Sequence, residues 1–439
     1  MYNATTMEKL FLSVCSDTLR AHDGFDIRGE LGTYSAAMVV WLGITKRLTS
    51  TSLSQALAAL AQQLEHTDLN AFVDRPSQKL RDRNMSLHTG GLSRAQQRMP
   101  EEMLQELFLH SGKEIEAHYQ KQQELSVPNV YMLDGMVLTT ARTNATMECY
   151  GTVKNRKKTL HYPRVRCVAA HRIDTGVCAS MTIGAYTDHE SVLARQVLEQ
   201  LPPDSIVVED RGFSAPGLLA YAQERGIKSI VRLKDTVGKK LLKLQGQQPS
   251  FLWESYSSID DKEVTIEGRI VHVENNVPGF RTSTLYLFTN SSLSDEKIAE
   301  LYRQRVQVET AIRYIKQTLR LAFVTARTPE AIRKEIYTAY LTFNLVRAIM
   351  YDIASVGGIA VNRLSFTKTI SFIVAYGPVL LSAKTKDVPA ILGRFRKYIL
   401  QCKNPLRKKP RSYPREVKMP RGKYPLASTV ELVNQEKGK

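Results

Sequence analysis

The sequence predicts an α/β fold in which a mixed β-sheet is flanked by helices, with a helical N-terminal domain and an all-β insertion. Three observations predict it. Residues 1–125 carry apolar side chains at helical spacing, short strand-like runs alternate with helices over 126–234, and 235–290 is rich in Gly, Ser and β-forming residues. At 439 residues, the chain is long enough for two or three domains.

The N-terminal domain, residues 1–125, is predicted to be helical and to bind DNA. One helix ends near the break Thr49-Ser-Thr-Ser52, and a second follows from about Leu53. Pro100 opens a further helix. Two helices joined by a short break could form a helix-turn-helix that reads DNA, although most such pairs are only packing units. The DNA-binding interpretation therefore depends on the rest of the chain.

Strand signals begin after residue 127. Val130–Leu133 is a nearly continuous apolar run that meets Asp134 directly, and residues 164–170 and 177–183 suggest a hairpin. Residues 205–208 form a short buried strand that ends in Glu209-Asp210, and a helix and another strand follow. This alternation is typical of a layered α/β sheet.

A helix is predicted from about Ser294 and includes the stretch Leu301–Gln317, which contains no Gly or Pro. One flank is apolar. At about 100° per residue, four polar side chains fall within roughly a 60° arc beside that flank: Tyr302, Arg305, Glu309 and Lys316. For an isolated helix, a solvated Arg305–Glu309 ion pair at i, i+4 is the simpler interpretation.

The C-terminal part is predicted to comprise helices over 356–402 and a basic, disordered tail over 403–439. The net charge of the chain is +18, and residues 296–439 account for it with 28 Lys+Arg against 10 Asp+Glu. This excess favours a polyanionic partner, most simply nucleic acid. An anionic membrane surface is the alternative, but no amphipathic, aromatic-rich basic helix supports it.

The five cysteines are scattered and form no CxxC pair, which argues against a zinc module or a disulfide framework. Neither a signal peptide nor an apolar run long enough to span a membrane is visible. We therefore expect a cytoplasmic protein without a membrane partner.

Three acidic residues form the candidate catalytic set. Asp134 interrupts an apolar strand, Asp210 ends another, and Glu309 lies on the helix that must pack against the sheet. Singly, they could be a turn former, a helix-cap partner and a surface ion pair. Together, oxygen ligands without thiolates favour Mg²⁺ or Mn²⁺ over zinc. Two such ions flanking a phosphodiester activate a water or a 3′-hydroxyl and stabilise the leaving oxygen.

Three blocks in this order carry a resemblance: Leu133-Asp134-Gly135, Glu209-Asp210-Arg211-Gly212-Phe213, and Tyr-x2-Arg-x3-Glu-x6-Lys at positions 302, 305, 309 and 316. The sequence resembles the insertion-sequence-four family of DDE transposases over about residues 30–350. The resemblance implies an RNase H-like catalytic core over 126–234 and 291–355, and cut-and-paste DNA transposition. Val306 and Met136 depart from the family pattern, in which an aromatic residue and Thr are common.

The resemblance also implies roles for single residues. Asp134, Asp210 and Glu309 would be the ligands of two metal ions, and Tyr302, Arg305 and Lys316 would hold phosphates at the transposon end. Further DNA contacts are expected from Arg313, Arg211 and Trp253. For Trp253, stacking on an unpaired base and packing in the core of the insertion are both open.

The implied partners are double-stranded DNA, both the terminal inverted repeats and the target, and a second copy of the chain in a homodimeric synaptic complex. A location at the bacterial nucleoid follows. Two alternatives remain: an RNase H-like DNA nuclease without strand transfer, and a non-catalytic DNA-binding repressor derived from a transposase. The basic C-terminal region argues against the first, and the three intact carboxylates argue against the second.

Overall fold

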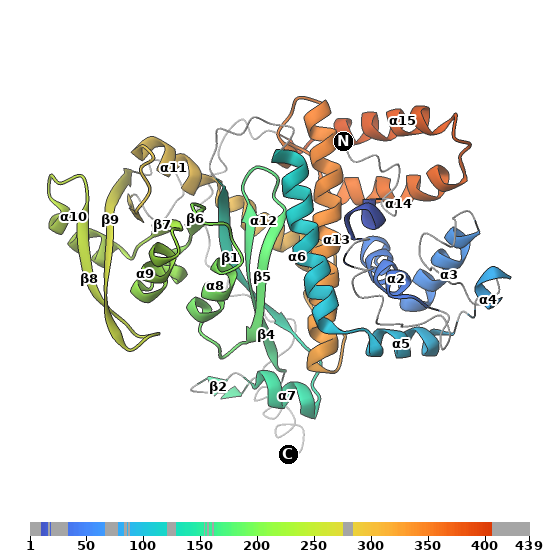
Figure 1. Ribbon diagram of the computed structural model, residues 1–439, viewed down its shortest axis with the longest axis horizontal. Helices are drawn as coiled ribbons and strands as arrows, with labels where there is room; N and C mark the ends of the chain where they lie inside the picture. Colours follow the sequence, from blue (N-terminus) through green and yellow to red (C-terminus); the bar gives the residue numbers. More distant parts are fainter. Residues whose placement is uncertain are drawn as a thin grey trace, which may run out of the picture. The chain divides into compact units, whose positions relative to one another are not determined.

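Figure 1 shows the computed structural model, which describes residues 10–15, 18, 34–65, 78–82, 86, 88–120, 129–152, 154–155, 158–159, 162–274 and 284–405. The chain divides into two units. One comprises Met1–Val273 and Tyr286–Pro405, and the fold presented here belongs to it; the other comprises Glu274–Leu285 and Leu406–Lys439. Apart from residues 403–405, the predicted disordered tail lies outside the described residues.

A mixed eight-stranded sheet forms the centre of the fold, with the strand order β5-β4-β1-β6-β7-β10-β9-β8. The strands are β1 (Val130–Thr139), β4 (Arg164–Arg172), β5 (Cys178–Ala185), β6 (Ile206–Glu209), β7 (Lys228–Arg232), β8 (Phe251–Ser257), β9 (Lys262–Glu274) and β10 (Thr284–Thr289). β5, β4 and β1 pair antiparallel, whereas β6 and β7 run parallel to β1. This arrangement confirms the predicted fold class, a mixed RNase H-like sheet flanked by helices.

Helices cover both faces of the sheet. On one face, α8 (Glu190–Leu198) and α9 (Pro216–Glu224) form a core with the odd-numbered residues of β1, Tyr131 and Leu133. On the other face, α11 (Asp295–Gln304) and α12 (Val306–Arg313) pack on the even-numbered Val130 and Met132. Because side chains alternate along a strand, Asp134 follows Met132 toward α12.

The long helix α13 (Pro329–Val356) runs beside α6 (Glu101–Gln120) in Figure 1, and both helices contribute to the largest core cluster. Asn344 of α13 exchanges hydrogen bonds with the backbone of Cys178, at 2.8 and 2.9 Å, and Arg347 donates to the carbonyl of Thr175. The helix therefore fixes the turn between β4 and β5. After it come α14 (Phe366–Ser382) and α15 (Val388–Gln401). No helix in the described part of the chain has the length and hydropathy needed to cross a bilayer.

The N-terminal region is helical where it is described. Its helices are α2 (Ala36–Thr49), α3 (Leu53–Leu64), α4 (Gln78–Arg81), α5 (Thr89–Arg98) and α6. The predicted break between the first two is present, since Ser50 adopts a left-handed conformation with φ 56°. Ser52 then forms a capping box with Gln55, so the sequence itself stops one helix and starts the next.

The insertion differs from the prediction. Residues Asp235–Gln245 form the helix α10, so the segment is not all-β. Val237, Leu241 and Leu242 give this helix an apolar side that packs in the core of the insertion. The high average content of Gly and β-formers hid this short helical pattern. In addition, β10 pairs antiparallel with β7, so the strands of the insertion extend the central sheet.

A buried polar network joins α6 to the sheet and predicts a pH-dependent stability. Tyr131 donates a hydrogen bond to Glu116 at 3.1 Å, and Arg172 lies 3.8 Å from the same carboxylate. Burial raises the pKa of Glu116 from its ordinary value of 4.5 to about 7, against the opposing effects of Arg172 and Tyr131. The folded chain therefore binds a proton that the unfolded chain has released between these two pH values.

The stabilisation from this carboxyl is complete below pH 4.5 and is lost as the pH rises through about 7. We expect the free energy of unfolding of the wild type to fall over this range relative to that of Glu116→Gln, by at most about 1.4 kcal/mol per pH unit. Glu114→Gln, an exposed neighbour on the same helix, is the control. Parallel pH profiles of wild type and Glu116→Gln would contradict the assignment.

Candidate active site

The first two acidic residues lie side by side at one edge of the sheet. Met132 of β1 is in parallel register with Val208 of β6, and Asp134 and Asp210 each follow two residues later. Their side chains therefore emerge at the same level and on the same face. Asp210 directly follows β6, at the cap of a short 3₁₀ turn over Arg211–Phe213. The carboxyl ends of parallel strands are where open α/β sheets place their sites.

The third acidic residue reaches the site from α12. The buried Val308 packs this helix on the sheet, and the next residue, Glu309, is half exposed beside Asp134. Burial raises the pKa of Asp134; Arg305 and the Gly135 amide lower it, and the charges of Glu309 and Asp210 raise it further. The Gly135 amide donates to Asp134 Oδ1 at 2.8 Å. Asp134 therefore lies close enough to both other predicted carboxylates to be affected by their charges.

Arg305 lies among these carboxylates. It donates a hydrogen bond to Asp134 Oδ2 at 3.3 Å and another to Glu309 Oε1, and its side chain is only 14% exposed. Burial lowers the pKa of Arg305, but the charges of Asp210, Asp134 and Glu309 raise it above its usual range. The predicted i, i+4 pair is thus present, and it is part of a larger cluster.

The donor chemistry of the cluster suits a divalent cation, because it consists of carboxylate oxygens at a partly buried sheet edge. The positions are less suitable. In the described part of the chain, no group of three or more His, Cys, Asp or Glu side chains lies close enough to hold one metal ion. The guanidinium of Arg305 is instead the shared partner of the carboxylates.

Tyr302 and Lys316 lie at the rim of the same cluster. The Tyr302 hydroxyl donates to Asp210 Oδ1 at 3.4 Å, and burial together with the Asp210 charge raises the pKa of this phenol to about 12. Lys316 lies on a π-helical turn, Tyr314–Thr318. Burial lowers the pKa of its ammonium, while Cys167 and Asp134 raise it. The structure thus brings all four polar residues of the predicted arc to one place.

Arg211 and Arg313, two further predicted DNA contacts, differ from the residues of this cluster in their exposure to solvent. Arg211 and Arg313 are exposed. The Arg313 guanidinium lies 5.7 Å from the ring centre of Tyr314, which stacks on Phe366 at 4.6 Å. Both arginines are open to a phosphate partner, and their DNA contacts stay a prediction.

Trp253 requires a correction. Its side chain is 9% exposed and packs edge-on against Phe288 at 5.7 Å, in the core formed by α9, α10 and the strands of the insertion. An indole in this position cannot stack on a DNA base without leaving its core. Of the two interpretations that the sequence left open, the structure supports core packing.

We expect Trp253→Ala to destabilise the chain by about 3 kcal/mol, because it leaves a large cavity in the small core of the insertion. The shift in the denaturation midpoint measures this effect. Tyr256→Ala on the same strand is the matched control, since its ring is 54% exposed. A midpoint for Trp253→Ala equal to that of the control would return Trp253 to the stacking role.

Three side chains near the carboxylates were not predicted. Arg232 ends β7, and its charge lowers the pKa of Tyr302. Glu209 is 1% exposed, and burial raises its pKa to about 8. Glu190 Oε1 lies 2.0 Å from where a Cβ of residue 135 would be, so position 135 has room only for glycine while Glu190 keeps this position. The sequence did contain a signal for Arg232: it ends the strand β7, which is parallel to the strand that precedes Asp210, so its side chain could be expected near the carboxylates.

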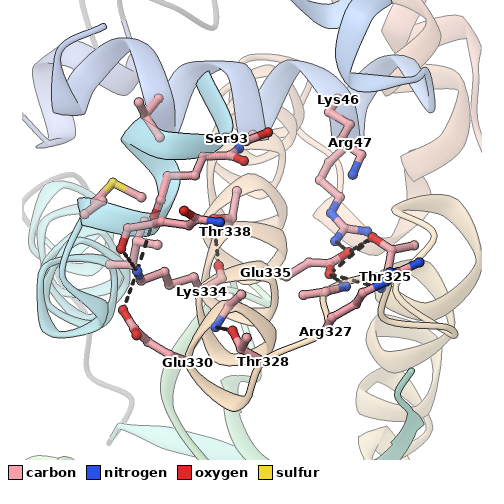
Figure 2. Close-up of a pocket in the computed structure, with 18 residues that line it drawn as sticks. Lys46, Arg47, Ser93, Thr325, Arg327, Thr328, Glu330, Lys334, Glu335 and Thr338 are labelled. Atoms are coloured by element: carbon pink, nitrogen blue, oxygen red, sulfur yellow. Dashed lines mark hydrogen bonds and ion pairs between the residues drawn. The ribbon is translucent and has the colours of Figure 1, made fainter. Parts of the chain in front are cut away.

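A pocket of about 560 Å³ lies away from the carboxylates, where α2 and α5 meet the start of α13 (Figure 2). Two of its cations are buried and paired: Arg47 with Glu335 at 2.5 Å, and Lys334 with Glu330 at 2.5 Å. Lys334 also donates to the carbonyls of Gln96 and Gln97 at the end of α5. These pairs neutralise one another and connect the N-terminal helices to the core.

The comparisons with known proteins agree with the geometry. Residues 126–345 match the family model described as "Transposase DDE domain". The chain is 26% identical over 285 residues to "Transposase InsG for insertion sequence element IS4" of Escherichia coli, which covers 61% of this chain and 62% of the relative. It is 23% identical over 316 residues to "Putative transposase for insertion sequence element IS4SA" of Synechocystis, covering 71% of this chain and 80% of the relative.

The match thus spans less than two thirds of the length of the Escherichia coli relative. A solved structure, "Cryo-EM structure of piggyBac transposase synaptic complex with hairpin DNA", aligns with 90% of this chain and 86% of its own at 13% identity and a TM-score of 0.40.

Proposed function

The chain belongs to the transposase DDE domain family, and from this premise we propose that it is a DNA transposase that cuts and pastes an insertion sequence at terminal inverted repeats. The observation that carries the proposal is the convergence of Asp134, Asp210 and Glu309 on one edge of the sheet. A nuclease without strand transfer and a non-catalytic repressor are the two other candidates, and neither is favoured by a feature of the described residues.

In this proposal, Asp134, Asp210 and Glu309 are the ligands of two Mg²⁺ or Mn²⁺ ions. Such ions, when bound, supply activation of a water or a 3′-hydroxyl and stabilisation of the leaving oxygen. The protein side chains fix the DNA. Tyr302 and Lys316 lie at the rim of the carboxylate cluster, where a phosphate beside the scissile bond would lie, and Arg211 and Arg313 extend the contacts outward.

The partners in this proposal are the inverted repeats, the target DNA and a second copy of the chain, which holds the other end of the element. Residues 1–125 form the DNA-binding domain and the basic tail from 403 adds affinity for any DNA, at the bacterial nucleoid. The charge excess of residues 296–439 supports this assignment, since this range contains 28 basic residues and only 10 acidic ones.

The test combines purified chain, Mg²⁺ and a DNA that carries the two ends of the element encoding it, with a supercoiled plasmid as target. A transposase cuts at both ends and joins them covalently to the plasmid. Cleavage without joined product would favour the nuclease, and specific binding without cleavage would favour the repressor. Either result would overturn the proposal.

A further inference from the structure

Arg305 points into the carboxylate cluster, where it lies between Asp134 and Glu309. Its guanidinium bonds Asp134 and Glu309 at once, and its side chain is 14% exposed. By contrast, Arg303 on the preceding turn is exposed and uses its Nε to bond the carbonyl of Ala299. The N–H groups that bond Asp134 and Glu309 could bond a DNA phosphate only after they had left these carboxylates.

The helical backbone is tightened at Arg305, where two hydrogen bonds span three residues instead of four. Arg305 separates α11 from α12, and its amide bonds the carbonyl of Tyr302 at 3.1 Å, three residues earlier. Its own carbonyl accepts from the Val308 amide, again over three residues. Such tighter turns inside a helix often mark a hinge. The arginine therefore lies at a joint, one turn before Glu309.

A guanidinium and a divalent cation compete for the same oxygens. Asp134 Oδ2 and Glu309 Oε1, which Arg305 holds, are oxygens that a metal ion between the strands and α12 would need. We propose that Arg305 fills the cation position of the carboxylate cluster in the DNA-free protein and exchanges the carboxylates for a DNA phosphate when a transposon end binds. This rests on the carboxylates being the metal ligands of the proposed function.

The exchange couples two binding events. When a DNA phosphate binds Arg305, the oxygens of Asp134 and Glu309 are no longer bonded to the guanidinium and can bind a metal ion. DNA therefore raises the affinity for the metal, and the metal raises the affinity for DNA by the same factor. The free protein then holds metal weakly and does not cut DNA at random. Arg305 is a positioning residue in this scheme, with opposite effects on the two ligands.

The experiment measures Mn²⁺ binding to the full-length chain, by electron paramagnetic resonance of free Mn²⁺, without DNA and with an end-bearing duplex. We expect Arg305→Gln to bind Mn²⁺ roughly tenfold more tightly than wild type without DNA, since one competing positive charge is removed. The same variant should bind the duplex more weakly. Arg303→Gln, which removes a charge two residues away on α11 from a side chain that bonds the carbonyl of Ala299, should behave as wild type in both assays.

A second measurement does not depend on the Gln variant folding well. In wild type, the duplex should raise the Mn²⁺ affinity, and in Arg305→Lys, whose single ammonium cannot bridge both carboxylates, this gain should be smaller. Mn²⁺ affinity of Arg305→Gln equal to or below that of wild type, with a duplex effect unchanged in Arg305→Lys, would overturn the inference.

Asp134→Asn separates this failure from failure of the proposed function. If wild-type binding of Mn²⁺ depends on Asp134 but not on Arg305, the carboxylates hold metal and only the exchange is wrong. If Asp134→Asn binds Mn²⁺ as wild type does, the carboxylates are not the ligands, and both the proposed site and the exchange are wrong.

Discussion

Asp134→Asn, Asp210→Asn and Glu309→Gln are each expected to lower DNA cleavage to below about one per cent of the wild-type rate. Each change keeps the shape of the side chain and removes one negative charge. The three carboxylates lie on β1, at the end of β6 and on α12, so each reaches the cluster from a different element. The measurement is the rate of strand cutting at an element end in saturating Mg²⁺.

Binding of the DNA end should persist in these variants, since the lost charge repelled phosphate. Glu300→Gln is the matched control, because Glu300 lies on α11 and pairs with Lys297 and Gln304 at the surface. It should cut at the wild-type rate. A carboxylate variant that retains more than a few per cent of activity has no essential role in cleavage.

The sequence was sufficient to predict the arrangement of these carboxylates for a physical reason. Asp134 and Asp210 each follow a short apolar run. Such runs mark buried strands, so the sequence pattern itself indicates where these strands reach the edge of the sheet. Glu309 lies one residue from Val308, which the helical period assigns to the core side. Local periodicity thus determines which face each residue takes.

The bond between Arg305 and Asp134 could not be predicted in the same way. The pairing of Arg305 with Glu309 follows from i, i+4 spacing, but the bond to Asp134 joins residues 171 positions apart. The same spacing is compatible with an arginine that turns to solvent. Only the packing of α12 on β1 selects the inward position, and the sequence contains no local signal for it.

The insertion shows a second limit. Trp253 lies in an alternating strand, which predicts that one side of the strand is buried, but not which one. Burial of the Trp253 side depends on Phe288 of β10 and on α10, and β10 reaches this place by pairing with β7. A long-range strand pairing therefore decided between the core and the stacking roles.

Arg47 of α2 connects the N-terminal helices to the segment that follows α12 (Figure 2). Its guanidinium donates to the carbonyls of Leu319 and Arg320, at 3.1 and 3.2 Å, and to Glu335 at 2.5 Å. Arg320 has φ 53°, so the chain reverses here, just after the π-helical turn that carries Lys316. One buried side chain thus holds residues 319 and 320 against α13.

Arg47→Met is therefore expected to destabilise the folded chain by about 3–5 kcal/mol, because it leaves Glu335 and two carbonyls without their buried donor. Glu335→Gln should cost less, since its amide oxygen can still accept from the amides of Thr325 and Ala326. In the double variant, the combined loss should be smaller than the sum by about 1–3 kcal/mol. Denaturation midpoints measure all three, with Lys46→Met as the control: Lys46 lines the same pocket and has no ion pair within the described residues. If Arg47→Met unfolds at the midpoint of this control, the bonds of Arg47 to Leu319, Arg320 and Glu335 do not stabilise the fold.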